Sequence, residues 1–150
     1  MAAVPKAKPV RVQDAYPWAD DTTQAPDPWG FTKRQCVSYV AWRLHQVGRP
    51  VYSRQGWGDA RSWDDTARAK GRTVTTRPAV GSVAHWNAGE RSAFYSGGSA
   101  GGSFVAGSQG HVAWVTKVYA DGSVQVAQYN GTASRAYSTM RVKAPRFLRL

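Results

Sequence analysis

The apolar residues change their spacing once along the chain, and this change limits the fold. In the first half they recur at helical intervals, as in RQCVSYVAWRLHQVG, which predicts a helix with Cys36 in its first turn. A second, shorter helix is predicted over 59–71, with Asp59 as its cap. Short strand-like segments follow, and Asp121-Gly122 between two of them is a hairpin signal. Helices first and antiparallel strands after predict an α+β fold, with about five or six strands in the sheet.

Size and composition indicate a single domain. The chain has 150 residues, of which 42% are hydrophobic, and this is enough to bury one core. We expect this domain to span residues 16–150 and to be a monomer, preceded by a flexible basic arm over residues 1–15. The stretch 87–110 is rich in Gly and Ser, and it is predicted to be a mobile loop.

The charge of the chain favours polyanionic partners. Twenty Lys and Arg against nine Asp and Glu give a formal charge of +11, which suits nucleic acid, anionic lipid or an anionic cell-wall polymer. The basic residues are spread along the chain without a zinc-finger or RNA-binding motif, so we expect no nucleic-acid partner. No apolar run approaches the ~18 residues of a membrane span, and the N-terminus lacks the apolar segment of a secretory signal.

The chain contains one cysteine, Cys36, and its surroundings favour reactivity. A lone cysteine forms no internal disulfide, so it is either a buried core residue or a reactive thiol. The unpaired N–H groups and the dipole at a helix N-terminus favour a thiolate, and Lys33 and Arg34 add positive charge nearby. The sequence therefore predicts a thiol with a lowered pKa.

A nucleophilic cysteine needs a base, and the chain offers three histidines. His45 lies on the helix of Cys36 but nine residues further on, too far to reach the thiol. His85 lies on a strand predicted to be in the core, where a packed or edge residue is expected. His111 opens a strand directly after the Gly/Ser-rich stretch, and it is the candidate general base.

Four segments together resemble the CHAP domain, the cysteine- and histidine-dependent amidohydrolase/peptidase family. They are WGFTKRQCVSYVAWRL, GWGDARSWDDTARAKG, RPAVGSVAHW and GHVAWVTKVYADGSVQVAQYNGT, and the resemblance runs from about Tyr16 to the C-terminus. It implies a papain-like α+β fold that cleaves a peptide or amide bond in bacterial peptidoglycan, with Cys36 as nucleophile and His111 as general base. The family usually has a glutamate and, two residues on, an asparagine, where this sequence has Gln128 and Asn130.

The third member of the site is open between these two amides. A regular ladder from a two-residue turn at Asp121-Gly122 makes Asn130 the nearer neighbour of His111, whereas the resemblance points to Gln128. Either amide oxygen can accept the imidazole N–H. Gln35, next to the nucleophile, is either an oxyanion donor or an ordinary first-turn polar residue.

Substrate and metal binding are less constrained by the sequence. Three aromatic residues near the site in sequence are expected either to wall a substrate groove or to pack in the core: Trp29, Trp114 and Tyr129. Three acids upstream of the cysteine are candidates for calcium, which some members of the family bind: Asp20, Asp21 and Asp27. Their spacing is irregular and interrupted by prolines, so we predict that no metal or other cofactor is required.

Two other function classes remain. A binding module that kept the fold but lost activity is compatible with the missing glutamate, and a nucleic-acid-binding protein is suggested by charge alone. For the enzyme, the resemblance leaves open whether an N-acetylmuramoyl-L-alanine amide or a peptide cross-link is cut. It implies action at the bacterial cell wall, where anionic polymers would retain a basic protein. The expected routes there are phage release, delivery by a secretion machine, or export of a longer chain from which this one is trimmed.

Overall fold

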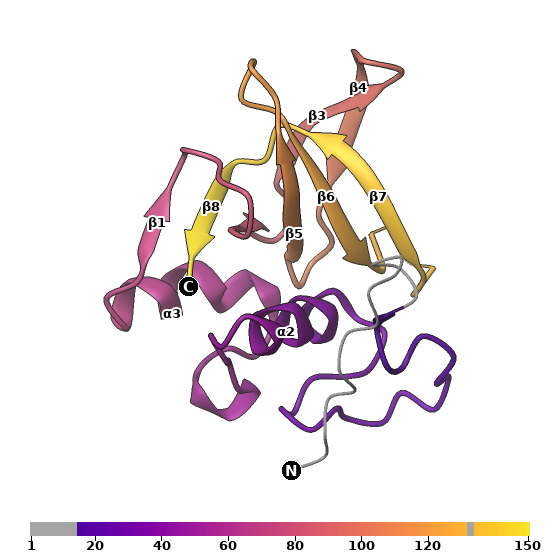
Figure 1. Cartoon of the computed structure of the whole chain (residues 1–150), viewed down its shortest axis with the longest axis vertical. Coiled ribbons are helices and arrows are strands. Elements are labelled where there is room, and N and C mark those ends of the chain that lie inside the picture. Colours follow the sequence, from indigo (N-terminus) through magenta and orange to yellow (C-terminus); the bar gives the residue numbers. More distant parts are fainter. Residues whose placement is uncertain (1–14, 132–133) are drawn as a thin grey trace.

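Helices and an antiparallel sheet form the two layers predicted from the sequence. The computed structural model describes residues 15–131 and 134–150, so nearly all of the expected N-terminal arm lies outside the described residues. Helices α2 (Cys36–Gln46) and α3 (Trp63–Ala69) lie below the sheet in Figure 1. The α+β class is confirmed. Within the described residues, no helix is long and apolar enough to cross a membrane.

The sheet has eight described strands in the order β1-β8-β2-β5-β6-β7-β3-β4, and all neighbours are antiparallel. The strands in chain order are β1 (Thr73–Thr75), β2 (Val83–Trp86), β3 (Arg91–Ser96), β4 (Ser99–Val105), β5 (His111–Val118), β6 (Val124–Tyr129), β7 (Tyr137–Val142) and β8 (Arg146–Arg149). Two short 3-10 helices, η1 (Ser53–Gln55) and η2 (Ala60–Ser62), lie before α3. The last strand, β8, was not expected, and it lies between β1 and β2.

Apolar side chains cover both faces of the central strand β5. Val112 and Trp114 belong to the core cluster shared with α2, whereas Ala113 and Val115 belong to a second cluster on the other face. Helix α2 buries six residues against the sheet: Ser38, Tyr39, Val40, Ala41, Trp42 and Leu44. Each fully buried large apolar side chain contributes roughly 1.5–3 kcal/mol, so this interface fixes the start of α2 against the start of β5.

The prediction of a loop over 87–110 is wrong for most of its length. Strands β3 and β4 form a hairpin there, joined by Gly97 and Gly98, which both have positive φ. Phe94 and Phe104 pack against the second core cluster, and β3 also pairs with β7. Gly and Ser are tolerated in β4 because most residues of this edge strand are exposed. This hairpin and β8 together account for the larger strand count.

Candidate active site

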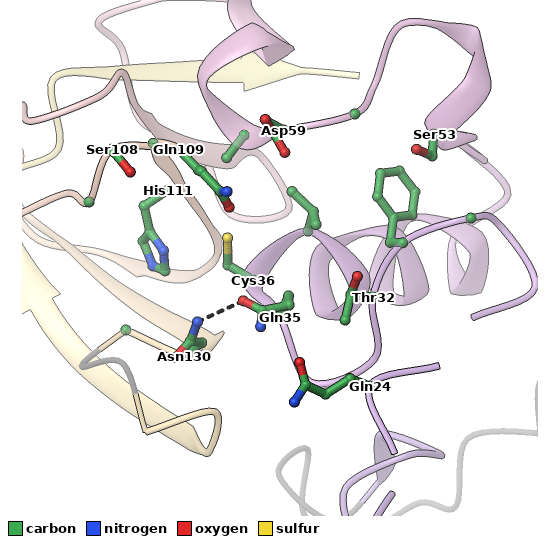
Figure 2. A pocket seen from close by; sticks show the side chains of 18 of the residues that line it. Gln24, Thr32, Gln35, Cys36, Ser53, Asp59, Ser108, Gln109, His111 and Asn130 are labelled. Atoms are coloured by element: carbon green, nitrogen blue, oxygen red, sulfur yellow. Dashed lines mark hydrogen bonds between the residues drawn. The ribbon is translucent and has the colours of Figure 1, made fainter. Parts of the chain in front are cut away.

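A cleft of about 660 Å³ lies where the N-terminus of α2 meets the start of β5. Cys36, the first residue of α2, and His111, the first residue of β5, both line it. Figure 2 shows the Cys36 sulfur and the His111 ring projecting into the same space from these two elements. The structure thus brings together the two residues that the sequence selected as nucleophile and base.

The loop before α2 is held by a buried carboxylate. The two oxygens of Asp27 accept hydrogen bonds from the backbone N–H groups of Trp29 and Phe31, both at 2.9 Å, and from the Ser38 hydroxyl at 2.7 Å. Ser38 lies in the first turn of α2, so this carboxylate ties the loop to the helix. Gly30 turns the loop with φ +91°, a conformation that side chains disfavour. Together these contacts fix the position of the Cys36 backbone.

His111 is oriented by Gln128. The His111 Nε2 and Gln128 Oε1 atoms are 2.7 Å apart, and the Gln128 amide nitrogen donates to the Ser138 hydroxyl at 3.2 Å. An amide oxygen only accepts, so Nε2 of the imidazole carries the proton. Nδ1 is then the unprotonated nitrogen and is available as a base.

The prediction that Asn130 lies nearer to His111 is wrong, because the β5–β6 ladder is not regular. The turn pairs Tyr119 with Ser123 instead of forming a two-residue loop. A register shift between Val115 and Lys117 displaces the ladder again, so that Val115 pairs with Val126. The resemblance to the family, which favoured Gln128, identified the partner that the ladder argument missed.

Asn130 instead holds Gln35. The Asn130 side-chain oxygen accepts the Arg135 backbone N–H at 3.0 Å, so its amide nitrogen is the group that donates to Gln35 Oε1 at 2.7 Å. In Figure 2 this bond turns the Gln35 amide toward Asn130 and away from the Cys36 sulfur. The Gln35 amide nitrogen remains as a donor in the cleft wall. A role of Gln35 in binding the oxyanion or the substrate stays a prediction.

Burial sets the protonation of the Cys36–His111 pair. It raises the pKa of the Cys36 thiol to about 11, an effect that the backbone N–H groups of Val112 and Val37 oppose and the Asp59 carboxylate reinforces. Burial also lowers the pKa of His111 to about 4, and the hydrogen bond to Gln128 only partly opposes this. The expected lowering of the thiol pKa is therefore wrong. Both shifts favour a neutral thiol and a neutral imidazole over a thiolate–imidazolium pair.

The three aromatic residues proposed for a groove do not line this cleft. Trp29, Trp114 and Tyr129 are buried in the core cluster beneath α2. Trp29 stacks on the ring of His45, with centroids 4.1 Å apart, and borders a smaller neighbouring hollow. The alternative of core packing holds for all three. The aromatic rings that do line the cleft are those of Phe31 and Phe104.

Two of the three acids considered for calcium have protein partners in the structure. Asp27 is occupied by the loop described above, and Asp21 forms an ion pair with Lys33 at 2.9 Å. Asp20 is exposed. Over residues 15–131 and 134–150, no three His, Cys, Asp or Glu side chains group as a metal site. The absence of a metal requirement stays a prediction.

Two features of the site had no clear signal in the sequence. Asp59 was expected only as a helix cap, but its side chain makes no capping hydrogen bond and instead lines the cleft. Gly131 lies so close to the Gln128 amide that a Cβ atom there would be 2.6 Å from Gln128 Cδ. The absence of a side chain at this position leaves room for the Gln128 amide.

The family model of the CHAP domain matches residues 26–130, a range that includes Cys36, His111 and Gln128. The chain belongs to the CHAP domain family. Two curated relatives of this CHAP domain are both called N-acetylmuramoyl-L-alanine amidase sle1. One is from Staphylococcus epidermidis (strain ATCC 35984) and the other from Staphylococcus aureus (strain USA300). Each is 32% identical over 111 residues, or 74% of this chain. The chain covers only 28% and 27% of their respective lengths.

A solved structure supports the fold. It is the crystal structure of an N-acetylmuramoyl-L-alanine amidase from Staphylococcus aureus, with a TM-score of 0.60 and 24% identity. The match covers 87% of this chain and 36% of that one. At this identity the likeness concerns the arrangement of helices and strands.

Proposed function

We propose that this CHAP domain hydrolyses an amide bond of bacterial peptidoglycan, with Cys36 as nucleophile and His111 as general base. The observation that carries the proposal is the shared cleft, in which Gln128 fixes the imidazole tautomer and leaves Nδ1 as the base. The relatives described above are amidases by name, which favours the N-acetylmuramoyl-L-alanine bond over a peptide cross-link.

The mechanism starts from the neutral pair. As the Cys36 sulfur attacks the carbonyl carbon, its proton passes to Nδ1 of His111, so that no isolated thiolate forms in the buried site. The Cys36 backbone N–H at the start of α2 is placed to stabilise the oxyanion. The imidazolium then gives its proton to the leaving amine, and a thioester remains. His111 next takes a proton from water, which hydrolyses the thioester to an acid and restores the thiol.

The setting of this reaction follows from charge. A formal charge of +11 would retain the domain on anionic cell-wall polymers, so we place its action at the bacterial cell wall. We expect it to act there as a monomer, without a metal and without a nucleic-acid partner.

The test is digestion of purified peptidoglycan, followed by mass spectrometry of the fragments. We expect new N-terminal alanine from an amidase, and complete loss of products in Cys36→Ala and in His111→Ala. His45→Gln is the matched control, because this histidine lies outside the cleft lining and should be dispensable for cleavage. The melting temperature of each variant is also measured, and activities are compared only among variants that keep the wild-type value.

The rival classes give different results in the same experiment. A wild-type protein that binds the cell wall but releases no fragments would support the binding module. Retention of most activity in Cys36→Ala would refute the proposed nucleophile. Tight, strongly salt-dependent binding to duplex DNA, with no cleavage of peptidoglycan, would favour the nucleic-acid alternative.

A further inference from the structure

The described lining of the cleft contains one formally charged residue, although the protein as a whole is strongly basic. Among the described residues that line it, Asp59 is the only Asp, Glu, Lys or Arg. His111 also lines the cleft, but its lowered pKa favours the neutral ring. The other polar side chains are amides and hydroxyls, and no Lys or Arg belongs to the described lining. A chain with twenty basic residues therefore presents an acid beside its proposed nucleophile.

Asp59 and the Gln35–Asn130 pair lie on different sides of the nucleophile. In Figure 2 the Cys36 sulfur lies between the Asp59 carboxylate and the hydrogen-bonded amides of Gln35 and Asn130. The Asp59 charge also acts on the thiol, since it contributes to the raised pKa of Cys36. A substrate bound across the sulfur therefore meets neutral amides on one side and a carboxylate on the other.

The backbone around Asp59 is fixed by hydrogen bonds on several sides. The Asp59 carbonyl accepts the Ser62 N–H at 2.9 Å, and the Arg61 N–H donates to the Gln109 carbonyl at 2.8 Å. Nε2 of the buried His85 lies 2.7 Å from the Ala60 carbonyl. These contacts join the segment to β2 and to the turn before β5, so the backbone that carries Asp59 is fixed before substrate binds.

Within the described part of the chain, the Arg61 side chain competes for this carboxylate. The Arg61 guanidinium lies 3.6 Å from Asp59, and both side chains are about half exposed, at 55% and 48%. Exposed pairs of this kind contribute only about 0–1 kcal/mol, because water screens them and holding two side chains costs entropy. A ligand cation that enters the cleft can therefore displace Arg61.

We propose that Asp59 forms a subsite for an ammonium group of the substrate. The ligand class is a peptide with a free amino group near the cleaved amide, as in the side chain of a diamino acid. A carboxylate only accepts hydrogen bonds, and an ammonium group supplies both donors and the opposite charge. The inference rests on the proposed function, because it assigns a substrate feature to the same cleft.

The test compares two muramoyl tripeptides that differ only in the lysine side-chain amine, which is free in one and acetylated in the other. Their affinities are measured by calorimetry in a Cys36→Ala background, so that no cleavage interferes. We expect the peptide with the free amine to bind about tenfold more tightly, because a hydrogen bond between charged groups contributes about this much to affinity. Asp59→Asn should abolish this ratio, and Asp59→Lys should instead favour a succinylated peptide. Asp65→Asn, an exposed acid on α3 outside the cleft lining, should keep the ratio.

Equal affinity for both peptides, no binding of either, or a preference that survives Asp59→Asn would each overturn the inference. Hydrolysis of the same peptides by the wild-type protein tests the proposed function separately. Cleavage of both at equal rates, with equal affinities, would leave the amidase assignment standing and remove only the ammonium subsite.

Discussion

Replacing Gln128 by Glu should raise the pKa of the His111 imidazole. The Gln128 oxygen is 2.7 Å from His111 Nε2, so a carboxylate in its place would lie in direct contact with the ring. At about 4 Å between charge centres and an effective dielectric constant of about 20, the attraction is about 4 kcal/mol. Desolvation of the new carboxylate opposes it, and such contacts usually shift a pKa by about 1–3 units. The pKa of His111, lowered by burial to about 4, should therefore rise into the range of roughly 5–7.

The change also has a predictable effect on stability. The pKa of His111 in the wild-type fold is about 4, below its ordinary value of 6.5, so the unfolded chain binds the proton more tightly between these values. The contribution of His111 to the stability of the wild-type protein is therefore lost as the pH falls from about 6.5 towards 4. In Gln128→Glu the two pKa values lie closer together, so the part of this acid loss that is due to His111 should be smaller.

The assay is an NMR titration of the imidazole signals in a Cys36→Ala background. His45 and His85 serve as internal controls, because neither hydrogen-bonds to Gln128. A rise confined to His111 supports the assignment. No measurable rise, or an equal rise in all three histidines, would refute the argument that Gln128 is the orienting partner.

Four further outcomes test the site and its support. Gln128→Ala should lower kcat/KM on peptidoglycan by about tenfold or more, because it leaves a buried imidazole N–H without an acceptor. Asn130→Ala should lower kcat/KM less, and the reverse order would contradict the geometry. Gly131→Ala should mimic Gln128→Ala by displacing the amide, so unchanged kinetics would show that the amide can shift. Alkylation of Cys36 by iodoacetamide should accelerate steadily from neutral to alkaline pH because the thiol pKa is about 11, and a plateau through neutral pH would instead indicate a preformed ion pair. The Arg146 guanidinium donates to both carboxylate oxygens of Glu90, at 2.6 and 2.7 Å. Arg146→Met should lower the free energy of unfolding by about 1–3 kcal/mol in urea titrations, because it leaves the Glu90 carboxylate without this partner, and a loss below about 0.5 kcal/mol would contradict a stabilising role of the pair.

Local chemistry determined the parts of the site that depend on neighbouring residues in the chain. The helical spacing after Cys36 predicted α2 and placed the thiol at its start, and the strand pattern after Gly110 placed His111 at the start of β5. Periodicity and turn residues act over a few positions, so they can be read without knowing what packs against them.

Tertiary packing decided what these residues do in the site. The partner of His111 is Gln128 because the turn pairs Tyr119 with Ser123 and the ladder shifts near Lys117, and neither irregularity has a local signature. Strands β3 and β4 form because neighbouring strands supply hydrogen bonds and the second core cluster supplies apolar contacts. The many Gly and Ser residues of this stretch do not predict these contacts. The pKa of the thiol follows from burial, which outweighs the helix N-terminus that the sequence revealed. Asp59 enters the cleft only because the segment around η2 is bonded to the strands beside it. Burial and register are sums over distant parts of the chain, and they become fixed only when the chain is folded.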